Sequence, residues 1–203
     1  MTFRKKKITF LPVTMMLWGL LNLVLLQHSL NAYDKTRERY MATVQSGGDL
    51  AFREKMNVYM LNFFISLGGM PLYPEVGMES LLLMIPCEGG ERRFTSDFFL
   101  RSEMIRQGFK KGRAIVAWRI SDYAFGRESR YALALNPCTL SRTETKDYID
   151  YAVNVRVEYP AKCAVDIFKF PVRITIEEGL FHYLQQEGWL HPYTAVWRTR
   201  VVK

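Results

Sequence analysis

Three cysteines and three histidines carry the most versatile chemistry that this sequence offers. The cysteines are Cys87, Cys138 and Cys163, and none of them has the Cys-x-x-Cys spacing of a redox or zinc site. Cys138 and Cys163 lie near the ends of expected strands, so in an oxidising compartment they could form a disulfide. The alternative is that all three are small, buried hydrophobic side chains.

The histidines have no spacing that suits a metal ion on one helix; they are His28, His182 and His191. The adjacent Glu177 and Glu178 would point to opposite faces of a strand. The sequence has neither a Gly-x-Ser-x-Gly motif nor a phosphate-binding glycine loop. We therefore predict no catalytic residue, no cofactor and no metal, and a protein that is not an enzyme. A membrane-tethered hydrolase that uses His182 or His191 is the catalytic alternative.

The net charge of +8 is distributed unevenly along the chain. Four of the 28 basic residues lie at positions 4–7, and no acid precedes Asp34, so the rest of the chain holds 24 cations against 20 acids. The other basic positions are short and scattered, which predicts that nucleic acid is not a partner. These positions are 109–113, Arg198, Arg200 and Lys203.

An uncharged and mostly apolar run at 8–26 follows the four cations. At about 1.5 Å per residue, a helix of this length spans roughly 28 Å, close to the hydrocarbon thickness of a bilayer. A secretory signal usually has a shorter apolar region of about 7–15 residues, so we predict a retained anchor in the lipid bilayer. Cleavage after Ala32 is the alternative, which the bulky Leu30 disfavours. The predicted anchor includes Ile8, Leu11, Leu17, Leu20 and Leu26.

The charges beside the anchor predict its orientation. Four cations precede it, whereas the cations at 34–39 alternate with acids. The positive-inside bias then keeps the N-terminus in the cytoplasm and places the C-terminal domain outside the cell (inner) membrane. The predicted domains are a cytoplasmic start and anchor at 1–32, a helical stalk and packing helix at 33–70, and a β-rich extracytoplasmic domain at 71–203.

Two helical segments are expected after the apolar run. Residues 33–45 are rich in helix formers and can continue the first helix until Ser46-Gly47-Gly48 stops it. Asp49 can cap a second helix at 52–67, which Gly68-Gly69 would end. Residues 56–73 carry no charge, but asparagines, glycines and Pro71 argue against a second span. We interpret this helix as a core or interfacial helix.

The rest of the chain predicts an α+β protein, in which the transmembrane helix and stalk precede a domain with a C-terminal antiparallel sheet. Residues 149–159 alternate between apolar and polar side chains, and 172–177 repeat this pattern. We expect these two strands in one sheet, with Val153, Val155 and Val157 buried under the 52–67 helix. Further expected elements are strands at 79–87, 113–120, 130–135 and 193–202, and a helix at 95–108.

This layout resembles the TadE-like, pilin-related proteins of bacterial envelopes. The resemblance rests on "RKKKITFLPVTMMLWGLLNLVLLQ" and on the closing "YAVNVRVEY" and "FPVRITIEEGLFHYLQQEGW". It implies a non-catalytic, single-pass component of a pilus, conjugation or secretion assembly, with protein partners or its own copies as a homo-oligomer. No glycine precedes the apolar run and no glutamate begins it, so prepilin processing is not implied. A secreted binding module released after Ala32 is the alternative function.

Overall fold

A computed structural model describes residues 3–118, 122, 128–160, 162–167, 172–177 and 179–203. The side chains of residues 3–11 and 162–177 are outside that description. The chain divides into two compact units, Met1–Leu82 and Leu83–Lys203.

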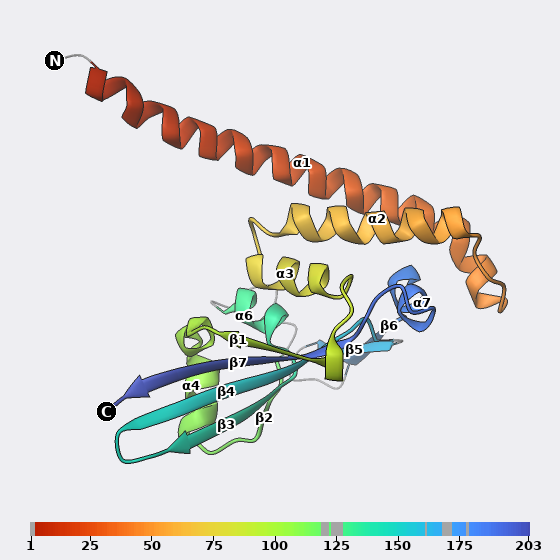
Figure 1. Ribbon diagram of the computed structural model, residues 1–203. Coiled ribbons are helices and arrows are strands. Elements are labelled where there is room, and N and C mark those ends of the chain that lie inside the picture. The colour runs from red at the N-terminus through yellow and green to blue at the C-terminus, as the bar shows by residue number, and fades with distance from the viewer. Residues whose placement is uncertain (1–2, 119–121, 123–127, 161, 168–171, 178) are drawn as a thin grey trace. The chain divides into compact units, whose positions relative to one another are not determined.

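The first unit begins with one long helix. Helix α1 (Phe3–Gln45) runs through Pro12 and ends at a turn in which Gly47 has a φ of 77°, a conformation that glycine adopts without strain (Figure 1). This confirms the expectation that the apolar run and the following polar stretch form a continuous helix.

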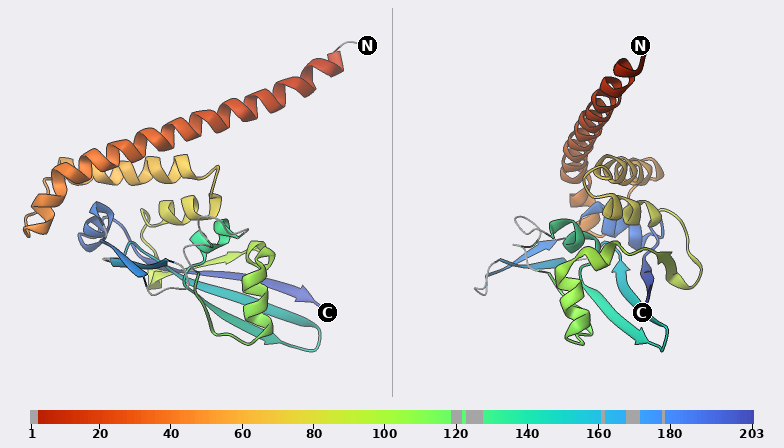
Figure 2. Two further views of the ribbon diagram at one scale, coloured as in Figure 1. Left: turned by 180° about the vertical axis from the view of Figure 1, so that it is seen from behind. Right: turned by 90° about the vertical axis from the view of Figure 1, so that its left-hand side faces the viewer.

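Helix α2 (Phe52–Gly69) runs back alongside α1 (Figures 1 and 2). The expected cap at Asp49 is wrong, because Ala51 is the N-cap and its N–H donates to Glu54 Oε2 at 2.8 Å. Asp49 instead forms an ion pair of 2.7 Å with Lys55. The helix ends at Gly69, as Gly68-Gly69 predicted.

Helix α3 (Pro74–Leu82) completes the first unit and corrects the prediction of a strand at 79–87. A short apolar run has no periodicity that separates a strand from a buried helix. Pro74 fixes a φ that suits the first helical position, and Glu75 lies in the first turn, where a negative charge is favourable. These two signals for the start of a helix decide the structure here, although the apolar composition of the run suggested a strand.

The second unit contains a mixed sheet. Among the described residues, five strands lie in the order β1-β7-β4-β3-β2. The β1–β7 pair is parallel and the other pairs are antiparallel, so the chain is an α+β protein with a mostly antiparallel C-terminal sheet. The strands are β1 (Glu91–Thr95), β2 (Ile115–Val116), β3 (Cys138–Glu144), β4 (Tyr148–Val157) and β7 (Tyr193–Val202).

The predicted pairing of 149–159 with 172–177 in one sheet is wrong. Both segments are strands, but β6 (Val172–Glu177) pairs with β5 (Lys162–Ile167) in a separate antiparallel pair. The reason is that β4 already pairs with β3 on one edge and with β7 on the other along most of its length. The connection between β3 and β4 is a tight turn, closed by a 2.9 Å bond from Thr145 N to Tyr148 O, so this local partner forms at low entropic cost.

One face of the sheet is buried, as the alternation in β4 predicted: Val153, Val155 and Val157 are 0%, 4% and 9% exposed. Within the same unit, η2 (Phe98–Arg101) and α4 (Glu103–Lys110) lie over this face (Figures 1 and 2). The Phe98 ring packs edge-on against Trp197, with 4.7 Å between centroids. The expected cover by the 52–67 helix would join the two units and stays a prediction.

The remaining expectations for the middle of the chain are partly wrong. The helix expected at 95–108 is divided between η2 and α4, because Ser102 caps α4. The strand expected at 130–135 is helix α6 (Ser129–Ala134), and the one expected at 113–120 contributes only β2 within the described residues. Two further short elements are η1 (Glu88–Gly90) and α7 (Leu180–Gln186).

Candidate functional site

Three strands of the sheet extend beyond their shorter neighbours and form what we call the sheet tip, residues 141–144, 148–152 and 198–202. The pairing of β2 with β3 ends at Thr139 of β3, and the pairing of β1 with β7 ends at Arg198 of β7. Among the described residues, no strand pairs with the outer edge of 141–144 or of 199–202. Backbone N–H and C=O groups on such edges are available to a further strand.

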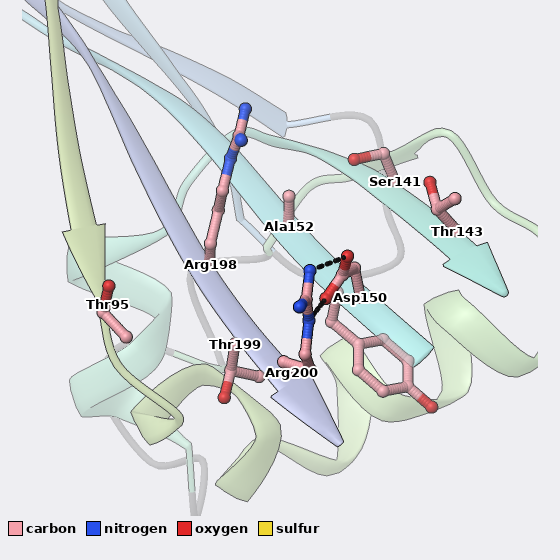
Figure 3. Close-up of a pocket in the computed structure, with 9 residues that line it drawn as sticks. Thr95, Ser141, Thr143, Asp150, Ala152, Arg198, Thr199 and Arg200 are labelled. Carbon is pink, nitrogen blue, oxygen red and sulfur yellow. Dashed lines mark hydrogen bonds and ion pairs between the residues drawn. The ribbon is translucent and has the colours of Figure 1, made fainter. Parts of the chain in front are cut away.

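A polar pocket of about 410 Å³ lies on one face of the sheet tip (Figure 3). Hydroxyl-bearing residues from four strands line it, and Figure 3 shows the Arg200 guanidinium directed at the Asp150 carboxylate, with Arg198 two residues earlier in β7. The pocket can offer hydrogen bonds and positive charge to a polar or anionic group. Its hydroxyls belong to Thr95, Ser141, Thr143, Tyr151 and Thr199.

The Arg200–Asp150 pair is the best-defined interaction in this pocket. Arg200 Nε and Nη2 donate to the two carboxylate oxygens at 2.7 and 2.9 Å, and the guanidinium lies 3.8 Å from the Tyr148 ring centroid. The hydrogen bond from Arg200 is the main cause that lowers the pKa of Asp150, and it raises the pKa of Arg200 in turn. Since this pair neutralises Arg200, Arg198 is the pocket's uncompensated cation in the described structure.

A second pocket, of about 510 Å³, lies between α4 and the sheet tip. It combines three cations with apolar side chains, a composition that suits an acidic group next to an apolar one. Arg106 pairs with Glu103, and Arg142 pairs with Glu144 at 2.7 Å, whereas Lys110 has no ion pair in the part of the chain that the structure describes. The apolar lining residues are Leu100, Phe109, Tyr151 and Val201.

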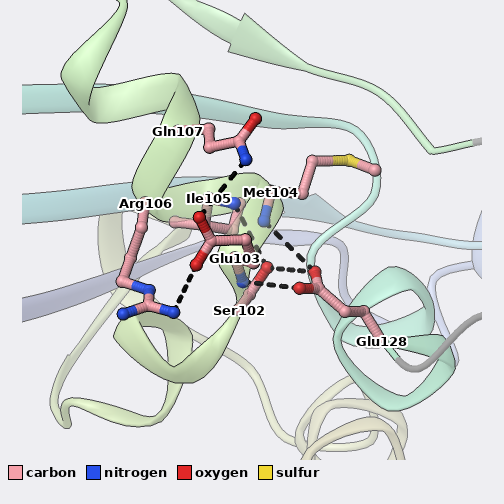
Figure 4. A network of polar contacts seen from close by, with 7 residues as sticks. All are labelled: Ser102, Glu103, Met104, Ile105, Arg106, Gln107 and Glu128. Carbon is pink, nitrogen blue, oxygen red and sulfur yellow. Dashed lines mark hydrogen bonds and ion pairs between the residues drawn. The ribbon is translucent and has the colours of Figure 1, made fainter.

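Ser102 and Glu128 form a polar network that could be mistaken for a catalytic pair (Figure 4). Ser102 Oγ donates to Glu128 Oε2 at 2.6 Å and accepts from Ile105 N at 3.2 Å, while the backbone N–H groups of Glu103 and Met104 donate to the same carboxylate. These are the unpaired amides at the start of α4, so the network caps this helix. Ser102 is 0% exposed, which keeps its hydroxyl from any substrate.

The two histidines considered for catalysis line neither of these pockets. The His182 ring Nδ1 lies 2.7 Å from Tyr159 O, and the backbone N–H of His191 donates to Leu83 O at 2.6 Å. In the described residues, no cluster of three or more histidine, cysteine, aspartate or glutamate side chains could hold a metal ion.

The cysteines offer limited chemistry in the structure. Cys138 is buried in β3, and burial raises the pKa of its thiol to about 12. Cys87 is half-buried, and its Sγ donates to Glu91 O at 3.1 Å. The side chain of Cys163 lies outside the described residues, so its pairing with Cys138 stays a prediction.

The predicted anchor residues all lie in α1. Leu17 and Leu20 are 60% and 48% exposed, Leu26 is half-buried, and the side chains of Ile8 and Leu11 are outside the description. By length and composition, one helix in the described chain is apolar enough to cross a membrane, and it is this one, over Pro12–Gln45.

Sequence reasoning missed the sheet tip, because its free edges depend on where β1 and β2 end. The sequence "ERRFT" has a single apolar residue and no period of two, so it carried no signal for β1. The alternation appears only in the structure, where Phe94 stacks on Trp197 at 4.4 Å while Glu91, Arg93 and Thr95 are exposed. No family model matches the chain, and no curated protein or solved structure matches it either.

Proposed function

We propose that this protein is a non-catalytic, membrane-anchored component of a pilus, conjugation or secretion assembly, which acts through protein contacts of its C-terminal unit. The observation that carries the proposal is the combination of a long, exposed apolar helix with a separate unit whose sheet tip has open edges. The TadE-like resemblance supports the same assignment and stays a prediction.

The exposed surface of α1 supports an anchor. Met15, Met16 and Trp18 are 67%, 68% and 65% exposed, and most of their apolar neighbours are exposed as well. Burying apolar surface is worth about 25 cal/mol per Å², so a helix with apolar side chains all round is far more stable in lipid than in water. The four cations that precede it favour a cytoplasmic N-terminus and an extracytoplasmic C-terminal unit.

The sheet tip supports a contact with an extended segment of another protein. A strand added to an open edge gains backbone hydrogen bonds, and pockets on the two faces select its alternate side chains. Here each pocket has one cation without an ion pair among the described residues, Arg198 on one face and Lys110 on the other. The arginines beside them are already paired with carboxylates of the chain itself. An acidic, alternating segment fits this arrangement best.

The intact mass of the protein extracted from membranes tests the anchor. The proposal expects a chain that retains the apolar helix and stays with the membrane after a high-salt wash. A soluble species that begins at Tyr33 would support the secreted binding module instead.

The hydrolase hypothesis has a separate test, since His182→Ala with His191→Ala should leave function unchanged if neither ring is catalytic.

Photo-crosslinking tests the sheet tip as the contact surface. A benzoylphenylalanine at Thr143 or Val202, both exposed at the tip, should crosslink to an assembly protein in cells. The matched control is the same group at Arg156, which is exposed on β4 away from the tip. Equal crosslinking from all three positions would contradict a specific surface, and a product of twice the chain mass would identify a homo-oligomer.

A further inference from the structure

The second half of helix α2 presents apolar side chains outward and buries polar ones. Met60, Phe64 and Leu67 are 38%, 37% and 37% exposed, and their spacing of four and three residues places them in one stripe. The same helix buries Asn62 at 0% and Ser66 at 4%, with Ser66 Oγ donating to Asn62 O at 2.7 Å. A helix that packs in water shows the reverse arrangement, so the exposed stripe needs an apolar environment.

The packing of α2 on α1 sets the level of this stripe along the anchor. A Cβ added to Gly68 would lie 3.0 Å from Leu26 Cα and N, so the two helix backbones are close at this point. Leu26 is the last residue of the apolar run, and the first charge after it is Asp34. Since α2 runs back along α1, its stripe lies in the zone between the end of the apolar run and the first charge, about 12 Å at 1.5 Å per residue.

The turn between α2 and α3, residues 70–73, follows the end of α2 that packs beside the apolar run of α1. No charged residue lies between Lys55 and Glu75, and Leu72 is 48% exposed. The N–H groups of this turn are hydrogen-bonded locally: Met70 N donates to Ser66 O at 3.2 Å, and Leu72 N and Tyr73 N donate to Gly69 O at 3.1 and 2.9 Å. Backbone without unpaired N–H groups can enter the lipid boundary at low cost.

We propose that the stripe of Met60, Phe64 and Leu67, together with the turn at 70–73, inserts into the headgroup–acyl boundary of the leaflet in which α1 ends. The anchor is then a helical hairpin, in which α1 spans the bilayer and α2, packed alongside it, enters the boundary with its C-terminal end. The polar start of α2, with Arg53, Glu54 and Lys55, stays in water. This inference rests on the proposed function, because it requires α1 to be in the membrane.

Lipid photo-crosslinking on the full-length protein tests the inference. The protein is reconstituted in vesicles of phosphatidylcholine and phosphatidylglycerol that contain an alkyne-tagged phospholipid. Benzoylphenylalanine replaces Phe64 or Leu72 in the inferred contact, Leu20 in the span, and Phe52 as the control. Phe52 lies on the same helix and is 70% exposed, but it belongs to the polar end. All four side chains are at least one third exposed, so the replacements do not disturb packing.

The expected result is strong lipid labelling at positions 64, 72 and 20, with at least tenfold less at 52. Lipid labelling at 20 without labelling at 64 and 72 would overturn the inference while leaving the anchor in place. Crosslinks from 64 to a second copy of the chain would also overturn it, because the stripe would then be a protein interface. Absence of lipid labelling at all four positions would contradict the proposed anchor itself.

Discussion

Arg200 binds both carboxylate oxygens of Asp150 across the β4–β7 ladder, where the two residues are directly opposite each other in register. The pair lies at the sheet tip, beyond the ends of β1 and β2. It joins two residues 50 positions apart in sequence, at a point where β7 has no strand on its outer edge among the described residues. The pair therefore holds the tip of the sheet together from one face.

The first prediction concerns the pH dependence of this pair. Hydrogen bonding to Arg200 lowers the pKa of Asp150 below its ordinary value of 3.8, so the folded state binds the proton less tightly than the unfolded state. The stabilisation is therefore present above pH 3.8 and is lost as the pH falls through the lowered pKa. Urea unfolding of the full chain in detergent, followed from about pH 7 to about pH 2.5, should show this loss. In Asp150→Asn the corresponding part of the acid slope should be absent.

The second prediction tests the buried face of β4. Val155 is 4% exposed, so Val155→Asp buries a carboxylate without a partner and should cost several kcal/mol, enough to unfold the C-terminal unit. Arg156 is exposed and makes a 3.0 Å ion pair with Glu158, so Arg156→Asp should cost no more than about 1 kcal/mol. Near-ultraviolet circular dichroism of both variants measures the difference. A folded Val155→Asp protein would show that this face is not core.

The third prediction concerns the thiols. Burial raises the pKa of Cys138 to about 12, so at about pH 8 the thiol stays protonated and out of reach. Iodoacetamide should modify Cys87 in the folded protein and Cys138 only after unfolding in urea.

The raised pKa of Cys138 also predicts that the stability of the folded state falls between pH 9.0, the ordinary pKa of the thiol, and about pH 12, because the unfolded state releases this proton first. Failure of Cys138 to react in urea until a reductant is added would indicate the Cys138–Cys163 disulfide.

The fourth prediction concerns the cap of α4. Glu128 accepts hydrogen bonds from Ser102 Oγ and from two backbone amides of the first turn, so Glu128→Gln should destabilise the C-terminal unit by about 1–2 kcal/mol. Glu158→Gln removes a carboxylate from a surface pair and should change stability by less than about 1 kcal/mol. Equal effects in chemical denaturation would contradict the capping role.

The elements that the sequence predicts well are those with long periodic patterns. Helix α1 has a long, uncharged and mostly apolar run followed by helix formers, and β4 and β7 each extend over ten residues. Short apolar runs were less informative: 79–87 and 130–135 lack a clear period, and both begin as helix where a strand was expected. In such runs the start signals and the packing environment decide the structure.

The sheet tip could not be predicted, because it depends on pairing between distant strands. The alternation in 172–177 identified a strand correctly but carried no information about its partner. The parallel pairing of β1 with β7 and the opposition of Asp150 and Arg200 both follow from register, which is fixed only when the strands assemble. The apolar helix, by contrast, needs no long-range contact, so composition and length were sufficient.

Thiol labelling of Lys203→Cys tests the central claim, that a membrane anchor precedes an extracytoplasmic C-terminal unit. The change is made together with Cys87→Ser and Cys163→Ser, and the remaining native thiol, Cys138, stays unreactive because it is buried. Lys203 is exposed at the end of β7, so a probe that cannot cross membranes will reach the new thiol if it lies outside. An extracytoplasmic C-terminal unit predicts full labelling in intact cells. Labelling only after lysis would contradict it, since the C-terminal unit would then lie in the cytoplasm.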